Sequence, residues 1–272
     1  MHLPIFLAIV AQSLSVGVSV SPRVETTTFH FDNPSSFASA TPVPHFFEQR
    51  YESSPRWLSV FANYEANGLI SRTRFSVSPN ATRRASDIDT FFETNGDVIT
   101  SGTDGSARLR GVEVREELLG VLAHDWRVGI DLSWRRDTAD FLPADIVVTH
   151  TTPGSTTRTY TTDQEFTTAN AILMGLRAER AVLIDRDWHL TVGASVRPLV
   201  FTQLIVQLPQ KYPGQDLSFS AYGFGSSAGV TLSHQRGPWH TAASIEATRT
   251  WSYRSTSAYT LSGVVASIAI RR

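Results

Sequence analysis

Hydrophobic and polar residues alternate along much of the chain after Pro55. The clearest example runs from Trp126 to Trp134, where Trp, Val, Ile, Leu and Trp occupy every second position and Arg, Gly, Asp and Ser lie between them. A period of two places one set on each face of a β-strand, whereas a helix would scatter both sets around its circumference. The recurring pattern predicts eight strands, at residues 69–78, 108–122, 126–136, 166–183, 188–202, 217–234, 239–253 and 257–271.

The connections between these strands are of two kinds. Three are tight turns at 123–125, 184–187 and 235–238, and they alternate with longer segments near 79–107, 137–165 and 203–216, followed by a last short connection near 254–256. The longer segments are rich in Thr, Ser, Gly, Asp and Pro, which is typical of loops. Asn95-Gly96 favours a hairpin within the first of them. The pattern therefore predicts an antiparallel meander with short turns at one end and long loops at the other.

The first 56 residues differ from the rest. The apolar stretch Leu3–Val20 is densest between Leu3 and Ala11, which is the length of a signal-peptide core and too short for a membrane helix. We expect a signal peptide at 1–21, a tail or linker at 22–56, and one domain at 57–272. The alternative for the apolar stretch is a buried or anchoring helix. Segment 56–68 is the most ambiguous part, and the alternative to eight strands is ten.

Aromatic residues mark both ends of the predicted strands. Trp126, Trp188 and Trp239 each follow a tight turn, and Trp134, Trp251 and Tyr253 lie near the opposite ends. Transmembrane barrels carry such aromatic girdles on either side of an apolar band. The strands of about 15 residues also exceed the roughly 9–11 that a tilted spanning strand needs. These six residues are therefore predicted to form two girdles.

The face opposite the apolar one carries many charges. The interior of a small barrel is filled by its own side chains, and buried charges are costly unless they are paired. We expect a lumen closed by ion pairs, and the alternative is a gated pore whose selectivity these charges set. The predicted lumen residues are Glu113, Arg115, Glu117, Arg127, Asp131, Arg135, Arg177, Glu179, Arg197 and Glu246.

Taken together, these features resemble the small eight-stranded outer-membrane β-barrels of Gram-negative bacteria. The resemblance covers about residues 57–272 and lies in architecture, not in a motif. It implies an all-β fold, a transmembrane antiparallel up-and-down barrel, and a place in the bacterial outer membrane. It also implies contact with outer-membrane lipid and lipopolysaccharide, and long loops that offer a site for an extracellular ligand. The alternative is a soluble lipocalin-like barrel with apolar residues inward, which the strand length, the tryptophan positions and the loop asymmetry disfavour.

Composition excludes several functions. The 24 Lys+Arg against 25 Asp+Glu give a net charge of −1, so we expect no nucleic-acid partner, which would need a basic surplus. The absence of cysteine excludes disulfides, cysteine-based zinc sites and cysteine nucleophiles. Four histidines lie near the tight turns, but their spacing defines no metal site. No metal and no cofactor are expected.

Two kinds of enzyme occur among outer-membrane barrels and are the alternatives to a non-enzymatic role. Outer-membrane lipid A deacylases use a His-x-Ser pair, which this sequence lacks. Omptin proteases use Asp and His residues at the loop end of a larger barrel, and the long segments here contain Asp87, Asp89, Asp137, Asp140, Asp145 and His150. We expect no catalytic residues and a structural or surface-interaction role. The alternatives are a narrow porin-like channel and a lipid-modifying enzyme or protease.

The adjacent pair Glu116-Glu117 conflicts with strict alternation, because one of the two must face lipid. A lipid-facing carboxylate near the middle of the membrane is unfavourable. Either a β-bulge in strand 108–122 or a contact with another protein would resolve the conflict. The bulge is the favoured interpretation.

Overall fold

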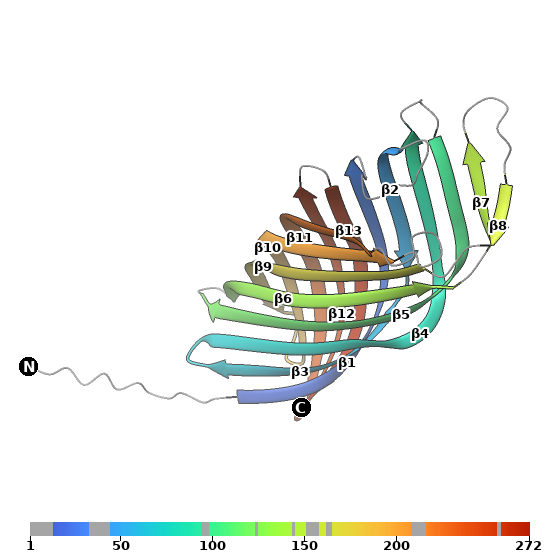
Figure 1. The fold of residues 1–272 in the computed structure, drawn as a ribbon. Coiled ribbons are helices and arrows are strands. Elements are labelled where there is room, and N and C mark those ends of the chain that lie inside the picture. Colours follow the sequence, from blue (N-terminus) through green and yellow to red (C-terminus); the bar gives the residue numbers. More distant parts are fainter. Residues whose placement is uncertain are drawn as a thin grey trace, which may run out of the picture.

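The computed structural model describes residues 13–32, 44–93, 98–122, 125–142, 145–150, 158–161, 165–207, 216–254 and 257–272. Within these ranges the chain is almost entirely β-strand (Figure 1). None of the described residues belongs to a helix long and apolar enough to span a membrane.

Ten long strands form a closed antiparallel barrel, the larger of the two counts that the sequence allowed. Strand β4 pairs with both β3 and β5, and this second pairing closes the ring. The barrel strands are β1 (Ser13–Asp32), β3 (Arg56–Ala66), β4 (Leu69–Glu93), β5 (Val98–Val121), β6 (Trp126–Phe141), β9 (Glu165–Leu183), β10 (Trp188–Gln207), β11 (Asp216–Arg236), β12 (Trp239–Arg254) and β13 (Ser257–Arg271).

The two strands beyond the predicted eight are β1 and β3. Strand β3 lies in segment 56–68, the part of the sequence that was most ambiguous. Strand β1 bridges the ends of the chain, pairing with β3 from Ser13 to Pro22 and with β13 from Gly17 to Phe31. Without β1, the sheet would have two open edges with unpaired backbone groups, which hydrocarbon does not tolerate.

The predicted tail at 22–56 is therefore wrong, since much of it belongs to β1 and to β2 (Pro44–Ser53). The predicted signal peptide at 1–21 overlaps β1 from Ser13 onward, so residues 13–21 belong to a strand of the barrel. The physical reason is that Val16, Val18 and Val20 face outward while small residues between them face the lumen. Valines that alternate with serine and glycine give this strand a composition similar to the less apolar end of a signal peptide. Residues 1–12 lie outside the described residues, and a leader there stays a prediction.

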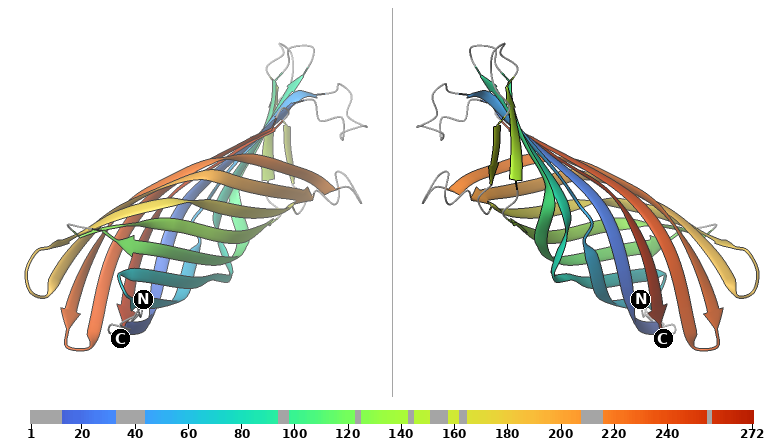
Figure 2. Two further views of the ribbon diagram at one scale, coloured as in Figure 1. Left: turned by 90° about the vertical axis from the view of Figure 1, so that its left-hand side faces the viewer. Right: turned by 90° about the vertical axis from the view of Figure 1, so that its right-hand side faces the viewer.

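Most of the predicted long loops are strand extensions. Strands β4 and β5 stay paired out to Phe92 and Val98, as the hairpin at Asn95-Gly96 predicts, although residues 94–97 themselves lie outside the described part. Strand β2 pairs with β1 and β4, and β7 (Asp145–His150) joins β5 to β8 (Arg158–Thr161). Figures 1 and 2 show these extensions gathered on one side of the barrel, at the end opposite the tight turns. We call this the loop end and the other the turn end.

The outer surface carries a belt of exposed apolar side chains on every barrel strand. On β6, for example, Val128, Ile130 and Leu132 are 39–50% exposed. The six predicted girdle residues are all on this surface: Trp126, Trp188 and Trp239 at the turn end and Trp134, Trp251 and Tyr253 toward the loop end. A closed barrel that turns apolar side chains outward is built for hydrocarbon and not for water.

No bulge occurs at Glu116. Strand β5 pairs with β6 without a register shift from Ala107 to Val121, and its shift against β4 lies between Ser78 and Ala81. The favoured interpretation of the Glu116-Glu117 pair is therefore wrong. Glu117 is buried in the lumen, and Glu116 is on the outer face between exposed Val114 and Leu118.

Candidate functional site

The lumen is the candidate site, because its polar side chains come from strands all around the barrel. Alternation places Asp131 and Ser133 of β6 inward, where both are buried, while Ile130 and Leu132 face outward. The same rule places pairs of charged residues inward on β5, β9 and other strands. These charges form two groups of ion pairs at different depths.

The first group, which we call the turn-side network, joins five arginines to four carboxylates. Its centre is Arg115, which contacts Asp131, Glu117 and Glu246 with N···O distances of 3.0–3.3 Å. Arg177 also contacts Glu117 and Glu246. The members are Arg72, Arg115, Arg127, Arg177, Arg197, Glu117, Asp131, Glu179 and Glu246.

Two carboxylates in this network are almost fully removed from solvent. Asp131 is 0% exposed and is held by both Arg115 and Arg197, whose guanidinium nitrogens donate at 2.7–3.2 Å. Glu179 is 1% exposed and accepts a bidentate pair of hydrogen bonds from Arg72 at 2.6 and 2.9 Å. Bidentate, charge-assisted bonds of this kind are among the strongest in proteins. They offset the cost of burying the charges.

The second group, the loop-side network, lies nearer the loop end and includes residues of β1. Arg23 donates to Glu113 at 2.7 Å, and Arg135 donates to both oxygens of Glu25 at 2.6 and 2.7 Å. Arg135 also bonds Asp137. These five residues add two arginines and three carboxylates. Over both networks, seven arginines therefore meet seven carboxylates, and their formal charges cancel.

Trp57 of β3 fills the lumen beside the loop-side network. Its side chain is 0% exposed, and the Arg23 and Arg135 guanidinium carbons lie 4.3 and 5.1 Å from its ring centroid. Such cation–π contacts are worth more in a site without water. Gly111 makes room for the ring, since a Cβ there would lie 2.4 Å from Trp57 Cη2.

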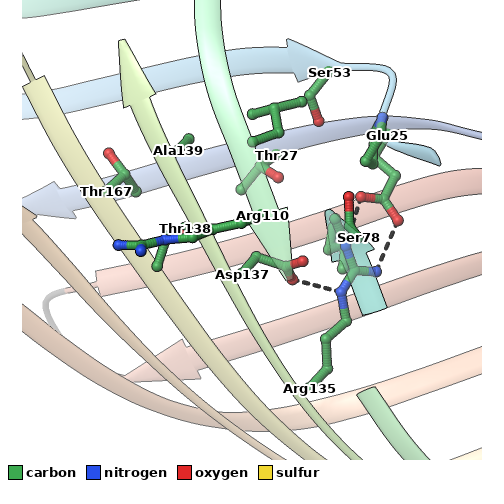
Figure 3. Close-up of a pocket in the computed structure, with 13 residues that line it drawn as sticks. Glu25, Thr27, Ser53, Ser78, Arg110, Arg135, Asp137, Thr138, Ala139 and Thr167 are labelled. Atoms are coloured by element: carbon green, nitrogen blue, oxygen red, sulfur yellow. Dashed lines mark hydrogen bonds and ion pairs between the residues drawn. The ribbon is translucent and has the colours of Figure 1, made fainter. Parts of the chain in front are cut away.

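A small polar pocket lies on the loop-end side of these residues (Figure 3). Glu25, Arg135 and Asp137 form one part of its lining, joined by the ion pairs that the figure marks. Hydroxyl groups supply much of the rest, including those of Thr27 and Ser78. Arg135 and the two carboxylates in this lining already satisfy one another, and Arg110 donates to the Thr138 hydroxyl at 2.6 Å.

All ten of the predicted lumen residues take part in these ion pairs. Four further network members, Arg23, Glu25, Arg72 and Asp137, are not among the predicted lumen residues. Arg72 could have been predicted, because it lies on the face of a predicted strand opposite Thr73 and exposed Phe75. Arg23 and Glu25 were hidden by the interpretation of their segment as a tail.

The residues weighed for catalysis are not assembled by the described part of the chain. Asp137 is committed to Arg135, and Asp140 lies farther along β6. The side chains of Asp87, Asp89, Asp145 and His150 lie outside the described ones. Among the described residues, no group of three or more His, Asp or Glu side chains is placed to hold a metal ion.

No protein-family model and no curated protein sequence matches this chain. A solved structure does match it in fold. The outer membrane protease OmpT from Escherichia coli superposes with a TM-score of 0.74 at 7% identity, over 97% of this chain and 98% of that one. The translocator domain of the autotransporter NalP from Neisseria meningitidis matches at a TM-score of 0.36 and 8% identity, over 92% of this chain and 88% of that one.

The architecture and the apolar belt together define the class of protein. This chain is a ten-stranded transmembrane β-barrel of the bacterial outer membrane. The likeness to OmpT concerns the fold alone, because only 7% of the residues are identical.

Proposed function

We propose that the protein is a non-enzymatic, non-conducting barrel that presents its loop end to the cell exterior for interaction with a partner. The observation that carries the proposal is the filled lumen. A charge-balanced set of long side chains crosses the barrel, and Asp131 and Glu179 at its centre are out of contact with solvent. A pore needs a continuous water path, which such packing opposes.

The extensions support the surface role. Strands β4 and β5 have 25 and 24 residues, more than twice the roughly 9–11 that span a membrane. Together with β2, β7 and β8 they form a one-sided projection beyond the rim (Figure 2). In outer-membrane barrels the short turns face the periplasm and the long loops face outward. The projection is thus suited to contact an extracellular ligand.

Lipopolysaccharide is the lipid partner in this proposal. Exposed Arg249 on the outer face of β12 lies 4.7 Å from the ring centroid of Trp251, near the loop end. A long arginine at this depth can direct its guanidinium to the headgroups. The planar guanidinium group can there make bidentate contacts to a headgroup phosphate.

The test is conductance in a planar bilayer. The wild-type barrel is expected to give no current steps above background. The matched variant replaces Arg115, Glu117, Arg177 and Glu246 by serine, which removes two charges of each sign and leaves Asp131 paired with Arg197 and Glu179 with Arg72. It should conduct once Trp57→Ala, Arg135→Ser and Glu25→Ser are added to these four changes, because Trp57 and the loop-side network also cross the lumen at their own depth. Discrete steps from the wild type would contradict the proposal.

A further inference from the structure

The outer face of the barrel carries a polar cluster at the level of hydrocarbon. Glu116 of β5 pairs in register with Leu132 of β6, which lies between the girdle residues Trp126 and Trp134. On its own strand it lies between Val114 and Leu118, which are 38% and 42% exposed. A carboxylate therefore lies inside the belt that otherwise meets lipid tails.

Neighbouring hydroxyl groups on β4 hold this carboxylate. Ser71 Oγ donates to Glu116 Oε1 at 2.7 Å, and Thr73 Oγ1 donates to Glu116 Oε2 at 2.5 Å. Both oxygens are thus oriented on the outer surface, beside the seam between β4 and β5. This arrangement is ordered, and no lumen residue takes part in it.

Two explanations for a lipid-facing glutamate were available, a bulge or a contact with another protein. The unbroken β5–β6 register removes the first. The second requires a partner that covers the seam within the membrane. Polar side chains are known to join transmembrane segments, because the alternative is to leave them in hydrocarbon.

We propose that two copies of this chain associate in the membrane through the outer face of the β4–β5 seam. A two-fold axis along the membrane normal brings residues of equal depth together, so the cluster in one copy meets the same cluster in the other. With the axis over the seam, Glu116 of each copy faces Thr73 and Ser71 of the other and not the second carboxylate. Each carboxylate keeps two donated hydroxyl protons, from its own copy or from the other, and is shielded from lipid.

The surroundings of the cluster fit a self-association surface. Leu69 and Phe75 on β4 and Val114 and Leu118 on β5 are exposed around it and supply apolar contact area. A second copy necessarily offers the complementary hydroxyls at the right depth, which a lipid tail does not.

Cysteine cross-linking tests the proposal cleanly, because the chain has no native cysteine. Leu118→Cys is placed beside the cluster, and Ile245→Cys is the control on the exposed outer face of β12, five strands away in the ring of ten. Each protein is reconstituted in lipid vesicles and treated with a short bifunctional thiol reagent. We expect dimers from Leu118→Cys and monomers from Ile245→Cys.

A third variant tests whether Glu116 itself makes the contact between the two copies. In Glu116→Leu/Leu118→Cys the cross-linked fraction should fall about tenfold, while the gel mobility shift on boiling confirms a folded barrel. Monomers from Leu118→Cys, equal cross-linking of the two single-cysteine proteins, or unchanged dimers after Glu116→Leu would each overturn the proposal.

Discussion

Replacing Asp131 with alanine is expected to lower the free energy of unfolding by about 3–5 kcal/mol. Asp131 is 0% exposed and binds both Arg115 and Arg197, so its loss leaves two buried guanidinium groups short of a counter-charge. The measurement is denaturant unfolding in lipid vesicles, followed by tryptophan fluorescence.

An exposed ion pair provides the matched control. Arg50 and Glu52 lie 2.7 Å apart with both side chains more than half exposed, so Glu52→Ala should cost less than about 1 kcal/mol. A further variant in which Asp131, Arg115 and Arg197 all become apolar should recover part of the loss, since no unpaired charge remains. If Asp131→Ala costs no more than Glu52→Ala, the networks do not stabilise the barrel.

Trp57→Ala is expected to have an effect of similar size, about 3–5 kcal/mol. The ring is fully buried between Arg23 and Arg135, and its removal leaves a cavity and two cations without their aromatic contact. The same unfolding measurement applies. Conductance should stay at background, because the turn-side network is intact.

The control for this prediction is another tryptophan. Trp239 is 51% exposed on the outer surface, so Trp239→Ala leaves no cavity in the lumen and should cost clearly less. Equal losses from the two variants would show that Trp57 is not a packing element of the lumen.

The strands that the sequence predicted best are those with large apolar residues on one face. In β6 from Trp126 to Trp134 and in β10 up to Val196, Trp, Val, Leu and Ile meet lipid while polar and small residues turn inward, so the period of two is clear. Strand β1 carries the same outward valines. However, its N-terminal end continues a dense apolar run that also suits a signal peptide, and alternation alone does not separate the two.

Which residues face the lumen could be predicted from the sequence more easily than which of them pair with one another. Inward position follows from alternation within one strand, so Glu113, Arg115 and Glu117 were found from β5 alone. The partner of each charge depends on the stagger between strands around the ring. Arg135, for example, binds Glu25, which is 110 positions away along the chain. The stagger depends on strand β1, because β1 closes the ring. The sequence pattern did not reveal that strand.

Cysteine labelling on intact Gram-negative cells, with a charged, membrane-impermeant thiol reagent, tests whether the barrel spans the outer membrane. Three single substitutions sample the barrel: Asp216→Cys at the loop end, Arg186→Cys at the turn end and Ile130→Cys in the apolar belt. We expect Asp216→Cys to be labelled on intact cells and Arg186→Cys only after the outer membrane is permeabilised. Ile130→Cys should react only after unfolding. Labelling of Ile130→Cys in the native protein as readily as Asp216→Cys would contradict a transmembrane barrel, and labelling of Arg186→Cys alone on intact cells would contradict its orientation.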